Sequence, residues 1–278
     1  MPINAFAYVL PALCRPLAAW FARSRLFTGL SVLLLLAACA GAGRTELNTF
    51  AEDSEVRKRA RVYLELAYAY FSDGMNTNAL DAVKQSLAAD DAWYEAHNLR
   101  GLIYMRLNEP ELAEEGFRKA LVLQSQAPSV QHNYGWLLCQ QGRMSEAMAM
   151  FGAALSNPNY DARAKTWMIQ GLCQAKVGQL ANAEKSLLMA FQLEPANPVI
   201  SYNLALHFFQ QQDYTRAQAF IAPLNASQWA NAETLWLGIK LAGKSGDGVQ
   251  VTALSASLRS RFARSREVNL LDKGVFDD

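Results

Sequence analysis

Small residues recur along this chain at a nearly constant spacing, and this repeat constrains the fold more than any other feature. Six positions separated by 34, 34, 36, 34 and 33 residues hold Ala or Gly: Ala67, Gly101, Gly135, Gly171, Ala205 and Gly238. Sixteen residues after each of the first five comes a bulky apolar residue: Val83, Phe117, Phe151, Leu187 and Ile221. Self-similarity at a period of about 20–50 residues is typical of stacked repeat proteins, so we expect one structural unit per period.

Turn-forming residues divide each unit in two. Asp73-Gly74, Gln141-Gly142 and Val177-Gly178 lie between apolar stretches, at positions where a helix would end. The pattern resembles the tetratricopeptide repeat, a pair of antiparallel helices, and residues 99–104 with 111–121 match it most closely. We therefore predict an all-α fold, a tetratricopeptide-repeat superhelix of about six helix pairs within residues 59–262. The predicted repeats are 60–93, 94–127, 128–163, 164–197, 198–230 and 231–262, of which the last is degenerate and resembles a cap.

The first 38 residues have the pattern of an export signal. They contain no Asp or Glu but three Arg residues, and residues 26–38 are almost wholly apolar. Such a stretch is typical of a secretory signal peptide and is short for a membrane-spanning helix. Leu36-Ala37-Ala38-Cys39 resembles the lipobox of bacterial lipoproteins, in which the Cys is acylated and becomes the first mature residue. An ordinary signal peptide followed by a chance cysteine is the alternative.

The lipobox resemblance implies lipidation at Cys39 after removal of a lipoprotein signal peptide, residues 1–38. Several acyl chains on one cysteine would anchor the protein to a membrane without a spanning helix. Ala40, where an Asp would favour the inner membrane, favours the outer membrane and its periplasmic face. Residues 39–58 would form the acylated amino terminus and tether, and residues 263–278 a carboxyl-terminal tail.

Charge and composition argue against several classes of function. The chain has 26 basic and 25 acidic residues, so it lacks the excess of Lys and Arg that nucleic-acid binding requires. Three His and four Cys show no metal-ligand spacing, and no nucleophile and base can be paired by spacing. We expect a protein that is not an enzyme, with no cofactor, no metal, no nucleic acid and no small-molecule substrate.

Two local patterns have a structural interpretation that we favour over a chemical one. Residues 238–245 satisfy the phosphate-loop pattern G-x-x-x-x-G-K-S, but we place Gly238 inside a repeat helix rather than after a strand. Cys139 and Cys173 are 34 residues apart, and a periplasmic location would permit a disulfide. Because they occupy different positions within their repeats, we expect them to be small buried residues rather than a disulfide pair.

The first helix of each repeat is expected to line a partner-binding groove. Residues at the second, fifth, ninth, twelfth and thirteenth positions of tetratricopeptide repeats usually face this groove, and here they are mostly apolar or aromatic. The projected groove residues are Leu64, Tyr68, Phe71, Asn98, Leu102, Met105, His132, Trp136, Met168, Leu172, Tyr202, Leu206 and Phe209, continued by Leu235 and Ile239. Some of them could instead belong to the core between repeats. Leu64 and Tyr68 stand where grooves that bind acidic chaperone tails carry Lys and Asn, which argues against that kind of partner.

Local segments resemble one family in particular. Residues 133–139 are similar to the N-Y-G-x-x-L segment of type IV pilus biogenesis lipoproteins of the PilF/PilW family, and residues 235–242 to their L-L-L-G-I-R-L-A segment. This resemblance implies a pilotin, which carries the secretin subunit to the outer membrane and promotes its multimerisation. The alternatives are a pilus-stability factor that does not act on the secretin and a generic tetratricopeptide scaffold lipoprotein of envelope assembly. The implied partner is a secretin subunit or another pilus-assembly protein.

Overall fold

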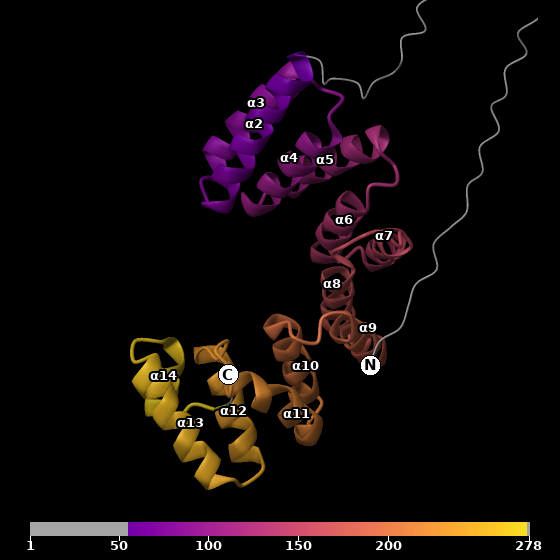
Figure 1. Ribbon diagram of the computed structural model, residues 1–278. Helices are drawn as coiled ribbons and strands as arrows, with labels where there is room; N and C mark the ends of the chain where they lie inside the picture. The colour runs from indigo at the N-terminus through magenta and orange to yellow at the C-terminus, as the bar shows by residue number, and fades with distance from the viewer. Residues whose placement is uncertain (1–54, 277–278) are drawn as a thin grey trace, which may run out of the picture. The chain divides into compact units, whose positions relative to one another are not determined.

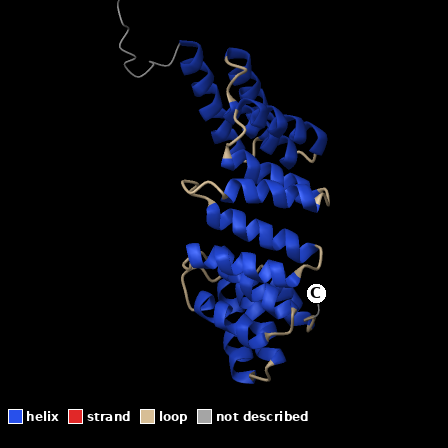
Figure 2. Cartoon of the chain, turned by 90° about the vertical axis from the view of Figure 1, so that its right-hand side faces the viewer, coloured by secondary structure: helices blue, strands red, loops and turns tan. Residues whose placement is uncertain are grey.

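The described part of the protein is helical throughout. A computed structural model describes residues 55–276, which belong to one compact unit, residues 53–278; the expected signal peptide and Cys39 lie outside the described residues. The helices, labelled in Figure 1, are α2 (Glu55–Ser72), α3 (Asn76–Ala89), α4 (Tyr94–Arg106), α5 (Pro110–Leu123), α6 (Pro128–Gln140), α7 (Met144–Leu155), α8 (Arg163–Lys176), α9 (Leu180–Leu193), α10 (Pro198–Gln210), α11 (Tyr214–Asn225), α12 (Ala232–Lys244), α13 (Gly248–Arg261) and α14 (Arg266–Lys273). Figure 2 shows loops but no strand between them in these residues. The predicted all-α tetratricopeptide fold is confirmed.

The turn inside each helix pair has the same backbone conformation. A residue with positive φ ends the first helix in each of the six pairs: Gly74, Asn108, Gly142, Gly178, Gln212 and Gly246, with φ between 60° and 77°. Glycine adopts this left-handed conformation at little cost because it has no Cβ, whereas Asn tolerates it and Gln does so rarely. The turn therefore fixes the antiparallel geometry of each pair, and Gln212 is the strained member.

Small residues on one helix are matched to large residues on its partner. A Cβ added at Gly101 would lie 2.6 Å from the Phe117 ring, and one added at Gly135 would lie 2.8 Å from Phe151. Both aromatic rings are fully buried, so the close approach of the helices depends on glycine. Gly171 likewise faces Leu187, whose Cγ would lie 2.8 Å from an added Cβ, and the alanines at this position, Ala67 and Ala205, are followed sixteen residues later by Val83 and Ile221. The repeat pattern in the sequence thus reflects the packing of a small residue on the first helix against a larger residue on the second.

The pairs stack in chain order. Each second helix packs on the first helix of the next pair, and successive first helices also pack on each other: α2 on α4, α4 on α6, α6 on α8 and α10 on α12. In the described residues, successive second helices make at most marginal contact. The first helices therefore line the inner surface of the superhelix and the second helices its outer surface.

The carboxyl-terminal residues differ from the expected tail. Residues 263–278 contain α14, whose N-cap is the Ser265 side chain, bonded to the Val268 N–H, and whose end is the left-handed Gly274. This helix packs on α12 and α13, and its Val268 is buried. Arg259 of α13 donates to Asp272 at 2.8 Å. This helix was not predicted, because it has only eight residues and lies outside the repeat period.

Candidate functional site

The inner surface brings together some of the projected groove residues but buries others. Leu64, Asn98 and His132 are each at most 6% exposed, and Leu235 and Ile239 are 1% exposed. The prediction that these five residues line the groove is wrong, because buried side chains are not available to a partner. Of the others, Tyr68 and Trp136 are exposed, and the remainder are half-buried: Phe71, Leu102, Met105, Met168, Leu172, Tyr202, Leu206 and Phe209.

Two of the buried polar residues bond to the next first helix instead of facing outward. Asn98 accepts a hydrogen bond from Asn133 Nδ2 at 3.0 Å, and His132 Nδ1 lies 2.8 Å from the hydroxyl of Thr166. Burial, with a smaller contribution from Lys165, lowers the pKa of His132 to about 4. These side chains therefore hold neighbouring repeats together, and His132 is neutral at pH 7.

At the amino-terminal end of the inner surface, an arginine side chain covers one of the aromatic rings. The Arg106 guanidinium lies 3.6 Å from the centre of the Phe71 ring and donates to the Phe71 carbonyl. Tyr68 is 41% exposed, and its partial burial, followed by the nearby Glu95 and Tyr94, raises its pKa above the ordinary value. Phe71 is thus held against α4 by Arg106, while Tyr68 is the exposed aromatic residue there.

A cleft opens on the inner surface between α8 and α10, which make at most marginal contact with each other. Its volume is about 320 Å³. Two projected groove residues, Leu172 and Leu206, line it from opposite helices, and the fully buried Leu187 of α9 also contributes to its wall. Lys176, Asn203 and Gln210 are the polar residues beside them. This cleft is where the predicted groove has a defined cavity.

The carboxyl-terminal end of the inner surface is aromatic. Lys240 Nζ lies 5.6 Å from the centre of the Phe209 ring and 5.8 Å from that of Trp236. The Phe276 ring stacks on Trp236, with centroids 5.3 Å apart and planes inclined by 19°. Residues after α14 therefore cover Trp236 at this end.

Cys139 of α6 and Cys173 of α8 form a disulfide, contrary to expectation. Their Cα atoms are 6.0 Å apart, within the usual bridging range. The two positions differ in their repeats by two residues, but α6 and α8 pack side by side and this offset still brings the sulfur atoms together. The bond ties the third repeat to the fourth. In the sequence, this disulfide was indicated by two cysteines that lie one repeat apart in a chain with an export signal.

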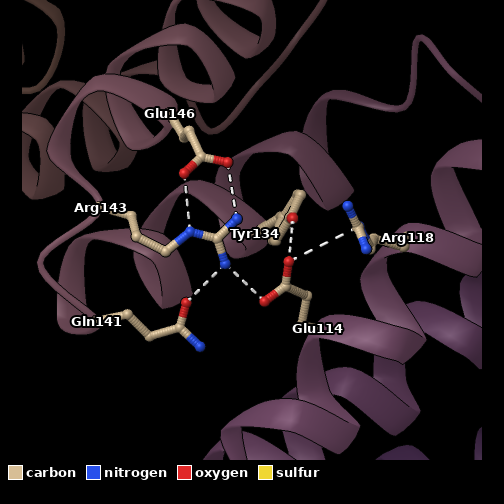
Figure 3. Close-up of polar contacts among 6 residues, drawn as sticks. All are labelled: Glu114, Arg118, Tyr134, Gln141, Arg143 and Glu146. Carbon is tan, nitrogen blue, oxygen red and sulfur yellow. Dashed lines mark hydrogen bonds and ion pairs between the residues drawn. The ribbon is translucent and has the colours of Figure 1, made fainter.

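A cluster of charged side chains joins α5 of the second repeat to α6 and α7 of the third repeat (Figure 3). Arg143 makes a bidentate contact with Glu146, at 2.8 and 2.7 Å, and donates to Glu114 at 2.7 Å. Tyr134 donates to the same Glu114 carboxylate at 2.7 Å. Burial of Glu114 opposes its ionisation, but the bonds from Arg143 and Tyr134 outweigh this and lower its pKa. Arg118 lies farther off, at 3.7 Å. These charges satisfy one another, so the cluster fastens repeats rather than presenting a reactive group.

The described residues show neither a cluster typical of a metal site nor a phosphate loop between a strand and a helix. Residues 55–276 contain no group of three or more His, Cys, Asp or Glu side chains arranged to hold a metal ion. The phosphate-loop pattern lies within α12 and its carboxyl-terminal cap, Ser245, where helix carbonyls rather than N–H groups are exposed. Within the described range, no helix is both long and apolar enough to cross a membrane.

Comparisons with known proteins agree with the fold. A family model for the tetratricopeptide repeat matches residues 64–128 and 99–164. The chain therefore contains tetratricopeptide repeats and has the fold of this class of protein. Within this class it is related to PilF, the type IV pilus assembly protein of Pseudomonas aeruginosa, with 26% identity over 212 residues, which is 76% of this chain and 84% of PilF.

Solved structures extend this relationship. The crystal structure of PilW, described as a widely conserved type IV pilus biogenesis factor, matches with a TM-score of 0.70 and 27% identity, covering 76% of this chain and 97% of PilW. The structure of Pseudomonas aeruginosa PilF matches in fold with a TM-score of 0.67 and 24% identity, covering 79% of this chain and 99% of that one.

Proposed function

We propose that this protein assists type IV pilus biogenesis as an acylated pilotin of the outer membrane, which localises the secretin subunit and promotes its multimerisation. The observation that carries the proposal is similarity to PilF and PilW over most of each relative's length, 84% and 97%. The match therefore extends beyond a few shared repeats to the whole repeat array of a pilus protein.

The proposed mechanism requires only attachment and binding. Acyl chains at Cys39 would supply attachment to the membrane. The inner surface, with the α8–α10 cleft and the exposed Tyr68 and Trp136, would supply the contacts to a pilus-assembly protein. Tetratricopeptide repeats typically act as protein-binding scaffolds, and no step here needs covalent chemistry.

The disulfide supports a location in the bacterial envelope. Disulfides persist in oxidising compartments such as the periplasm and are rare in the reducing cytosol. The bond between Cys139 and Cys173 is buried within the repeat stack, as expected for a structural disulfide. This agrees with the export signal that precedes Cys39.

Removal of the acyl acceptor tests the proposal. A Cys39→Ser protein should be exported but lose its membrane attachment, and piliation should fall to the level of a deletion strain. Cys14→Ser is the matched control, because Cys14 lies upstream of the apolar signal stretch, and it should leave piliation unchanged. Full piliation with an exported, soluble Cys39→Ser protein would sink the proposal.

A further inference from the structure

The α8–α10 cleft combines an apolar wall with a polar rim. Leu172 and Leu206 form the wall, with the fully buried Leu187 behind them, and the volume of about 320 Å³ lies at the small end of the range for ligand pockets. A cleft of this size fits an aliphatic side chain such as that of leucine, but not the face of a helix. Its occupant should therefore contribute a single apolar anchor.

The rim offers groups that recognise a peptide backbone. Asn203 Nδ2 donates to the Val199 carbonyl at 2.8 Å, and no group among the described residues donates to its Oδ1. Gln210 is exposed and makes no hydrogen bond through its side chain in the described residues. Amides of this kind can accept from the N–H and donate to the C=O of an extended segment.

The charge of the residues that line the cleft indicates the charge of its partner. Lys176 lies on the rim, is exposed and makes no ion pair with any described residue. No carboxylate of a described residue lines the cleft, and burial lowers the pKa of the His207 side chain that lines it, so Lys176 supplies the charge of the cleft. An exposed lysine without an ion pair is complementary to a carboxylate of an acidic segment.

We propose that the cleft binds an extended, acidic segment of a partner protein through one leucine-sized side chain. The leucine would enter between Leu172 and Leu206, the amides of Asn203 and Gln210 would bond the backbone, and flanking carboxylates would lie near Lys176. The inference rests on the proposed function in that the partner is a pilus-assembly protein, and it adds the chemistry by which that partner is recognised.

Three labelled heptapeptides and the full-length protein in mild detergent test this by fluorescence polarisation. The probes are SDDLDDS, SKKLKKS and SDDGDDS, which vary the charge and the apolar anchor separately. SDDLDDS should bind, and binding should weaken with added salt. The other two should bind about tenfold more weakly or not at all, since each lacks one half of the recognition.

Variants then place the binding in the cleft. Lys176→Glu should weaken SDDLDDS binding by about fivefold or more, because an attraction becomes a repulsion. Lys185→Glu on α9 makes the same charge change away from the cleft and should have no effect. Ala175→Leu should fill the cleft and abolish binding. Unchanged circular dichroism of each variant shows that it is folded.

Several results would overturn the inference. These are no binding of SDDLDDS, equal binding of the three probes, or equal effects of Lys176→Glu and Lys185→Glu. A dimer that Lys176→Glu dissociates would make a second copy of this chain the occupant, which also contradicts the proposal. Loss of secretin assembly in a deletion strain would leave the proposed function intact in every one of these cases, so the two failures are distinguishable.

Discussion

Removal of the Cys139–Cys173 disulfide should lower the stability of the repeat domain substantially. The bond closes a loop with a sequence separation of 34 residues. The chain-entropy relation gives about 13 cal/mol/K for such a loop, or about 3.8 kcal/mol at 25 °C. Both cysteines are 4% exposed, so Ala is a better replacement than Ser, whose hydroxyl would be buried. We expect Cys139→Ala/Cys173→Ala to lose about 3–4 kcal/mol of unfolding free energy.

Urea unfolding of residues 53–278, followed by circular dichroism, measures this loss, since these are the only two cysteines in that unit. The control is reducing agent, which should destabilise the wild type to the level of the double variant and leave the variant unchanged. Wild type and variant within about 0.5 kcal/mol of each other, without reductant, would refute the reasoning.

Three further changes test the packing, the turns and the buried histidine. Gly101→Ala should cost about 1–3 kcal/mol because its Cβ meets the Phe117 ring, whereas Gly152→Ala, with open space around it, should stabilise by a few tenths to about 1 kcal/mol in urea unfolding. Gln212→Gly should raise the thermal midpoint, since it relieves a left-handed residue worth about 1–2 kcal/mol against a smaller entropy cost; a lower midpoint would contradict this. For His132, the unfolded chain takes up a proton below about pH 6.5 that the folded chain resists until about pH 4, so stability falls as pH falls through this window. The loss at pH 5 should be about 2 kcal/mol and should disappear in His132→Gln, as urea titrations at pH 5 and 7 would show.

The helix pairs could be predicted from the sequence because their information is local. Each small residue and its large partner lie sixteen positions apart, as for Gly101 with Phe117, and each turn lies between them. Stacking order follows from chain order in such repeats. The six-pair interpretation therefore depended on no contact between distant parts of the chain.

The groove residues could be predicted only in part, because their exposure depends on the next repeat. Asn98 and His132 stand at the fifth position of their repeats, and whether this position is free depends on Asn133 and Thr166, about 35 residues later. The cleft between Leu172 and Leu206 likewise depends on the separation of α8 and α10. Position numbers within a repeat determine neither the contacts of the fifth-position side chains nor the separation of α8 and α10.

The disulfide and the last helix were missed for related reasons. Bridging by Cys139 and Cys173 depends on how α6 and α8 are offset, which position numbers within a repeat do not determine. The helix Arg266–Lys273 is defined by Ser265 and Gly274 and by packing on α12 and α13, outside any period.

The most direct test of the central claim is a blot for detergent-resistant secretin multimers in membrane fractions from cells with and without this gene. The account predicts that multimers disappear in the deletion strain, that secretin monomers collect in the inner membrane, and that the wild-type gene restores multimers. Persistent multimers with loss of pili would replace the pilotin role with a role in pilus stability. Persistent multimers together with normal pili would contradict the proposed function altogether.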